Sequence, residues 1–121
     1  MLFIEAPAFT RSLPSYLTDD EYRRLQATLM ANPEAGAVMP QTGGFRKCRW
    51  PDARRGKGTR GGLRIIYYCF REDSQIWLMT LYGKDELEDL TAVQKRALKA
   101  AINAERQARA TRRPSTRRKM R

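Results

Sequence analysis

The sequence predicts one α+β domain that is built on a mostly antiparallel sheet of about four strands. The predicted elements run in the order strand, helix, loop, three strands and helix. Short connections favour pairing between strands that are neighbours in the chain. The length of 121 residues fits a single domain. We expect this domain to cover residues 1–110 and a basic, disordered tail to follow at residues 111–121.

The N-terminal part is predicted to form a short strand at residues 2–5 and then a helix. The helix begins after Thr18, because Thr18 and Glu21 have the spacing of a capping box. It ends at Asn32, because a residue that precedes proline avoids the α conformation. Its expected apolar stripe consists of Tyr22, Leu25, Leu29 and Met30.

The middle of the chain is predicted to form three strands, of which the last two make a hairpin. Residues 33–44 contain prolines and glycines, so we expect a loop. Residues 51–62 combine glycines with four basic residues and are expected to form a mobile basic loop. Residues 71–74 are typical of a turn. The strand segments, rich in β-branched and aromatic residues, are 45–50, 63–70 and 75–82.

A second helix is predicted after Thr91, which is suited to capping its start. Its expected apolar stripe is Leu90, Val93, Ala97, Ala101 and Ala104, with Leu98 and Ile102 beside it. The preceding acids are interpreted as helix-start residues that complement the helix dipole. They are Asp85, Glu86, Glu88 and Asp89.

Metal and disulfide chemistry are disfavoured by the residue content. The acids match no calcium-binding loop, and the chain contains no histidine. We therefore expect no metal and no other cofactor. Cys48 and Cys69 are widely spaced and are expected to be two core thiols.

Charge is unevenly distributed and indicates a polyanionic partner. The net charge is +11, from 24 Lys and Arg against 13 Asp and Glu. Residues 46–71 carry nine basic residues and one acid, and residues 91–121 carry eleven and one. Nucleic acid, the ribosome and an anionic membrane surface are the candidate partners. No apolar run has the length of a membrane span, and a signal-peptide pattern is missing, so we expect a cytoplasmic protein.

The basic loop and its flanking strands hold the densest candidate site. Its cations are Arg46, Lys47, Arg49, Arg54, Arg55, Lys57, Arg60 and Arg64. Strand alternation places Lys47 and Arg49 on one face and Arg46 on the other. The alternative is a solvated loop that only aids solubility. Anion binding is favoured because an anion relieves the repulsion between crowded cations.

Arg64, Tyr82 and Lys84 are further candidates. Arg64 lies within a strand, where alternation predicts an otherwise apolar face. Its expected neighbours there are Ile66, Tyr68 and Phe70. A charge in such a place needs either a local acid or a bound phosphate. Tyr82 is suited to stacking on a base or to donating a proton, and Lys84 to holding a phosphate. The structural alternative is that Tyr82 is only an aromatic residue at a sheet edge and Lys84 only a charge that flanks a helix.

Three segments carry a family resemblance through their order and spacing. They are 43–49 (GGFRKCR), 56–68 (GKGTRGGLRIIYY) and 81–91 (LYGKDELEDLT). They resemble the RelE/ParE superfamily of type II toxin-antitoxin toxins, in its HigB-like branch. The resemblance covers about residues 2–105 and leaves the tail outside.

The resemblance implies a compact RelE-like sheet with helices packed against one face. It implies a ribosome-dependent mRNA endoribonuclease that inhibits translation without a metal, and that is neutralised by an antitoxin, expected to be a helix-turn-helix protein. The RNA's own 2′-hydroxyl would attack the neighbouring phosphate. Lys57 would be the base, because nearby cations help a lysine lose its proton. Arg60 and Arg64 would stabilise phosphate charge, Tyr82 would stack or act as acid, and Lys84 would support the phosphate.

Two alternatives remain open at this point. Relatives of the ParE type inhibit DNA gyrase, and a catalytically inactive chain would serve only as a basic antitoxin-binding module. The dense cations of residues 46–64 favour the RNA-cleaving branch.

Overall fold

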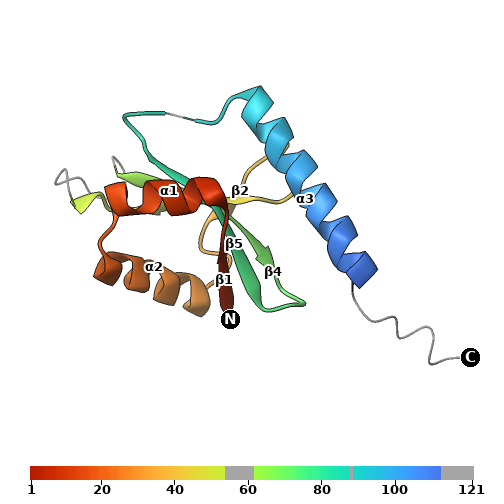
Figure 1. The fold of residues 1–121 in the computed structure, drawn as a ribbon. Coiled ribbons are helices and arrows are strands. Elements are labelled where there is room, and N and C mark those ends of the chain that lie inside the picture. Colours follow the sequence, from red (N-terminus) through yellow and green to blue (C-terminus); the bar gives the residue numbers. More distant parts are fainter. Residues whose placement is uncertain (54–61, 88, 113–121) are drawn as a thin grey trace, which may run out of the picture.

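The computed structural model describes residues 1–53, 62–87 and 89–112, which form a mixed five-stranded sheet and three helices (Figure 1). The strand order is β1-β5-β4-β3-β2. β1 is parallel to β5, and all other neighbours are antiparallel. The elements are β1 (Leu2–Glu5), α1 (Pro7–Tyr16), α2 (Asp19–Ala31), β2 (Ala37–Val38), β3 (Arg46–Trp50), β4 (Leu63–Phe70), β5 (Gln75–Gly83) and α3 (Ala92–Arg112). The α+β class and the β4–β5 hairpin are thereby confirmed.

Two of these elements are absent from the sequence-based prediction. β2 is a two-residue edge strand inside the expected loop, and it raises the strand count to five. α1 contains two prolines, which obscure its helical pattern. Pro7 stands at the start of the helix, where its missing N–H costs nothing, and Pro14 lies in the second half. Phe9 is the fully buried residue of this helix.

α2 begins as predicted, with a complete capping box. The Glu21 amide donates to Thr18 Oγ1 at 3.2 Å, and the Thr18 amide donates to Glu21 Oε1 at 2.8 Å. Leu25 and Leu29 are fully buried, whereas Met30 is 53% exposed. The buried stripe is therefore narrower than the sequence pattern suggests.

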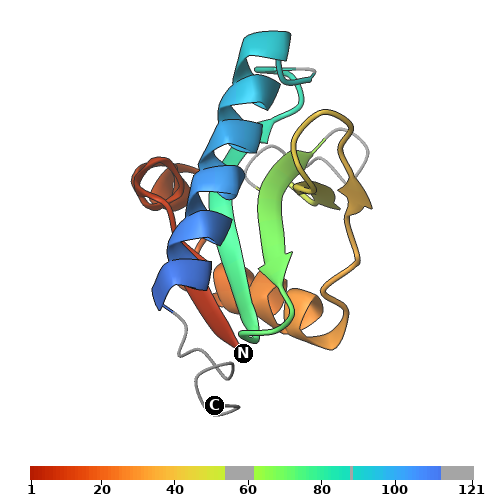
Figure 2. The ribbon, with the colours of Figure 1, turned by 90° about the vertical axis from the view of Figure 1, so that its right-hand side faces the viewer.

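The helices cover both faces of the sheet, which corrects the expectation that they pack against one. α1 and α2 lie on one side and α3 on the other, where it crosses in front of β5 (Figures 1 and 2). The first core contains Phe9, Leu25 and Leu29 from the two N-terminal helices together with Ile65 and Tyr67 from β4. The second core contains Phe45, Ile66, Phe70, Tyr82, Leu98 and Ile102. Successive β4 side chains thus enter different cores, as strand geometry requires.

A bulge in β5 decides which side chains of that strand face α3. Ile66 pairs with Thr80, but Tyr67 pairs with Leu78, so Met79 is an extra residue in the ladder. An extra residue reverses the alternation of all side chains beyond it. Tyr82 consequently projects to the α3 face, together with its cross-strand partner Arg64.

α3 begins with the predicted cap and packs through a different stripe. The Thr91 and Gln94 side chains accept from each other's backbone amides at 3.1 and 2.8 Å. Leu98 and Ile102 are buried against the sheet, whereas Val93 is 66% exposed. The side chains of Leu98 and Ile102 bury more apolar area than those of the alanines, so they determine how α3 is rotated about its axis. The helix includes the last two described residues, 111 and 112, and residues 113–121 lie outside the described part.

Candidate phosphate-binding site

Three polar side chains form a row across β3, β4 and β5. Arg49 pairs with Arg64, and Arg64 pairs with Tyr82. Residues that pair directly across antiparallel strands project to the same face, and like charges in such positions repel each other. The row therefore places two arginine residues opposite each other on the α3 face, at the end of the sheet where β4 begins. An anion between them would relieve the repulsion.

Arg64 is buried, with 4% of its surface exposed. Its Nη1 donates to the Leu63 carbonyl at 3.1 Å. Burial lowers the pKa of Arg64, the charge of Arg49 lowers it further, and Tyr82 acts in the opposite direction. The protein thus holds a cation where its charge is unfavourable. The predicted apolar neighbours of Arg64 on this face are confirmed as Ile66, Tyr68 and Phe70.

Tyr82 presents a buried hydroxyl group to this row. The residue is 8% exposed, and its hydroxyl has no hydrogen-bond partner among the described residues. Burial raises the pKa of Tyr82, the charge of Asp89 raises it further, and Arg64 opposes both. The phenol is therefore protonated at neutral pH and can donate a hydrogen bond or a proton. A buried hydroxyl without a partner is unfavourable unless a ligand satisfies it.

Lys47 lies on the same face, as predicted, because it pairs with Ile66 of the second core. Its Nζ is 3.5 Å from Asp89 Oδ1, and Lys95 Nζ of α3 is 3.6 Å from Asp89 Oδ2. Burial alone would raise the pKa of Asp89, but the Leu90 amide and the two ammonium groups hold it below its usual value. Asp85, Glu86 and Asp89 all precede α3, whose first turn contains no acid, so their interpretation as helix-start acids is wrong. Glu88 lies outside the described residues.

Of the other candidates, the structure places Arg46 away from this row. Arg46 projects to the opposite face, as predicted, where its Nη1 donates to the Gly36 carbonyl at 2.8 Å and its Nη2 is 3.9 Å from Glu34. Lys84 follows β5, and its backbone amide donates to Gly62 at 3.0 Å. Lys57, Arg60, Arg54 and Arg55 lie outside the described residues. Lys95 is a site residue that the sequence analysis missed, because only the fold brings α3 next to β3.

The remaining acids and the two cysteines show no metal-binding arrangement. Within residues 1–53, 62–87 and 89–112, no three Cys, Asp or Glu side chains form a group that could hold a metal ion. Cys48 is buried and Cys69 is half-buried, and both are free thiols as predicted. Burial raises the pKa of both thiols, so neither is an activated nucleophile.

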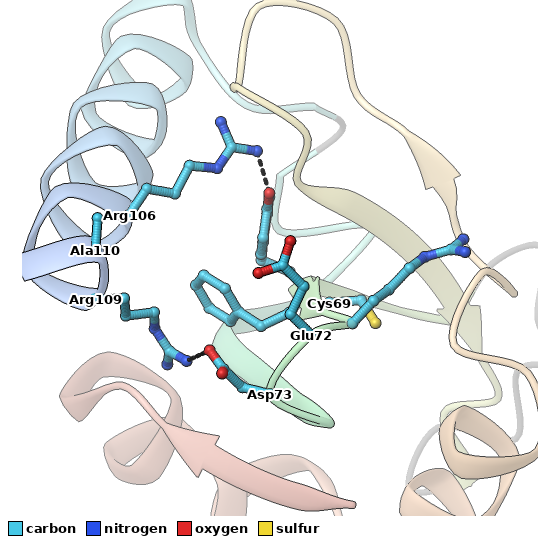
Figure 3. Close-up of a pocket in the computed structure, with 9 residues that line it drawn as sticks. Cys69, Glu72, Asp73, Arg106, Arg109 and Ala110 are labelled. Carbon is cyan, nitrogen blue, oxygen red and sulfur yellow. Dashed lines mark hydrogen bonds and ion pairs between the residues drawn. The ribbon is translucent and has the colours of Figure 1, made fainter. Parts of the chain in front are cut away.

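A cavity of about 450 Å³ lies near the other end of α3, next to the β4–β5 turn (Figure 3). Arg109 donates to Asp73 and to Glu105, at 2.8 Å in each case, and lies over the Phe70 ring. Arg106 donates to the Tyr68 hydroxyl and to the Gly43 carbonyl. The cations of this cavity are thus already engaged by partners within the chain.

No known protein-family model matches the chain. The resemblance to the RelE/ParE superfamily therefore stays a prediction from its motifs, and the functional argument depends on the geometry of the row. None of the helices in the described part of the chain combines the length and apolar character that crossing a bilayer requires.

Proposed function

We propose that this protein is the toxin of a type II toxin-antitoxin system, an endoribonuclease of the RelE/HigB type that cleaves mRNA on the ribosome. The observation that carries the proposal is the cross-strand pair of Arg49 and Arg64, beside a buried Tyr82 hydroxyl that has no partner among the described residues. Two adjacent arginines and a hydroxyl donor suit an anionic ligand, and a phosphodiester of RNA is such a ligand. The RelE-like topology belongs to the same proposal.

The proposed reaction is an attack by the RNA's 2′-hydroxyl oxygen on the adjacent phosphorus. The new O–P bond forms as the bond to the 5′-oxygen of the next nucleotide breaks. Arg64 and Arg49 stabilise the charge that develops on the phosphate oxygens. Tyr82 donates its proton to the departing 5′-oxygen, for which its raised pKa keeps it protonated. Lys57 is the proposed acceptor of the 2′-hydroxyl proton, and Arg60 and Lys84 are proposed to support the phosphate.

The ribosome and an antitoxin are the proposed partners. Alignment of the message by the ribosome supplies a large part of the rate, so a small basic domain needs few catalytic groups of its own. The positive charge of residues 46–71 suits an RNA-rich surface. The antitoxin is proposed to be a helix-turn-helix protein, and the toxin acts in the cytoplasm.

The test is induced expression followed by mapping of the 5′ ends of cellular mRNA. We expect new 5′ ends within translated regions, and we expect that Arg49→Ala abolishes them. Arg24→Ala removes the same charge from an exposed position on the α2 side and serves as the matched control. Growth arrest with intact messages would refute the proposal. Accumulation of gyrase–DNA cleavage complexes would favour the ParE-type alternative. Antitoxin binding without growth arrest would favour the catalytically inactive module.

A further inference from the structure

The Asp89 carboxylate lies in a small cationic environment that is built from β3, α3 and the segment that precedes α3. Lys47 of β3 approaches one carboxylate oxygen at 3.5 Å, and Lys95 of α3 approaches the other at 3.6 Å. The Leu90 amide donates to the same carboxylate at 2.8 Å. Two ammonium groups and an amide around one pair of oxygens are groups that bind phosphate as readily as carboxylate.

The exposure of these groups shows which of them can be exchanged. The side chains of Lys47 and Lys95 are 30% and 19% exposed, whereas that of Asp89 is 51% exposed. The cations are therefore held against the protein, and the carboxylate faces solvent. An external anion can reach the two lysines from the solvent side if the Asp89 side chain rotates away, with no rearrangement of β3 or α3.

We propose that Lys47 and Lys95 form a phosphate subsite that the Asp89 carboxylate occupies in the free protein and that a phosphate of the bound RNA takes over. The inference rests on the proposed function and extends it by one binding residue, Lys95, and one competing residue, Asp89. The subsite lies near the row of Arg49, Arg64 and Tyr82, because Lys47 stands two residues from Arg49 on the same face of β3. It would hold a phosphate that flanks the cleaved bond.

This arrangement makes the protein's own carboxylate a competitor of RNA. A single phosphate must displace Asp89 before it gains the two lysines, so isolated phosphates bind weakly. A message that is already aligned on the ribosome offers several phosphates at once and overcomes the competition. The subsite thus favours aligned RNA over free RNA, which suits a toxin that acts on the ribosome.

The experiment is a double-mutant cycle on the full chain with Asp89→Asn, Lys95→Met and the two together. The probe is a fluorescein-labelled, all-2′-deoxy oligonucleotide, which lacks the attacking hydroxyl, so binding is measured without cleavage. We expect Asp89→Asn to raise affinity about threefold to tenfold, and this gain to disappear in the Lys95→Met background. A gain that persists unchanged in that background would come from long-range charge alone and would overturn the proposal. Lys47→Met repeats the cycle from the other side of the carboxylate, and thermal unfolding of each variant verifies folding.

A second arm with inorganic pyrophosphate separates this inference from the proposed function. Coupling between Asp89 and Lys95 with both probes supports a subsite on the RNA path. Coupling with pyrophosphate and none with the oligonucleotide supports the phosphate subsite and counts against nucleic acid as its ligand. No coupling with either probe overturns the subsite, whatever the mRNA mapping shows.

Discussion

The face of the sheet that carries α3 has two arginine-containing ends, and they are built differently. Near the β4–β5 turn, Arg109 has Asp73 and Glu105 as ion-pair partners and the Phe70 ring beneath it. At the opposite end, Arg49 has no ion pair among the described residues and stands directly across from Arg64. The first arrangement satisfies the charge of Arg109 within the chain, and the second leaves the charge of Arg49 available to a ligand.

The difference separates a structural role from a binding role for the same residue type. An arginine that is engaged by acids and an aromatic ring holds two elements together, here α3 and the hairpin turn. Arginines that face each other destabilise the free protein, and such a cost is typical of functional sites. Cavity volume alone would select the end with the 450 Å³ cavity as the ligand-binding site. The absence of an ion pair at Arg49 among the described residues selects the other end.

The largest expected effect is that of Arg64→Ala on cleavage. Loss of the buried guanidinium should reduce the rate of cleavage of ribosome-bound mRNA about 10³-fold, because its stabilisation of the transition-state charge disappears. Arg106→Ala, the same substitution at the other end of the face, should leave the rate within about threefold. Single-turnover assays with purified ribosomes measure both. If both variants lost cleavage activity equally, the two ends of the α3 face would not differ in their role in catalysis.

The next effect concerns Tyr82→Phe, which deletes only the hydroxyl. Cleavage should fall about 10²-fold because the leaving oxygen loses its proton donor. The free energy of unfolding should stay the same or rise, because the deleted hydroxyl has no hydrogen-bond partner among the described residues. Urea unfolding and the single-turnover assay test the two parts. A large loss of stability would show that the hydroxyl has a structural partner.

Strand alternation was sufficient to predict half of this site from the sequence. It placed Lys47 and Arg49 together, Arg46 opposite, and Arg64 beside Ile66, and the ladder confirms this. The face of the sheet on which Tyr82 lies depends on the bulge at Met79, and no residue type in β5 predicts this bulge.

The contacts of α3 were not predictable in the same way. The ion pair of Arg109 with Asp73 joins segments far apart in the chain, and Lys95 meets Lys47 of β3 only through their shared partner Asp89. Both arrangements depend on the rotation of α3, which the burial of Leu98 and Ile102 decides. An alanine-rich helix offers several nearly equivalent stripes, so its sequence pattern alone selects the wrong one.

A third prediction tests the structural end of the face. Arg109→Met should lower the free energy of unfolding by about 1–3 kcal/mol, because Asp73 and Glu105 lose a charged hydrogen-bond donor while the apolar stem over Phe70 is retained. The rate of mRNA cleavage should change little. Urea denaturation with the cleavage assay as a control measures both. Loss of cleavage without loss of stability would assign this end of the face to the function.

The smallest expected effect is the pH dependence that Asp89 contributes to stability. Its pKa is lowered in the folded protein, so its ion pairs stabilise the fold above the unfolded pKa of roughly 4. That contribution is lost as the pH falls through the lower folded pKa. Because the side chain is half exposed, the contribution should be below about 1 kcal/mol. Wild-type and Asp89→Asn proteins should therefore differ slightly in unfolding free energy at pH 7 and converge in acid, as urea titrations at a series of pH values would show. If the difference in unfolding free energy between the two proteins stayed constant with pH, Lys47 and Lys95 would not stabilise the ionised Asp89 carboxylate. The carboxylate would then not act as the internal anion of the two lysines.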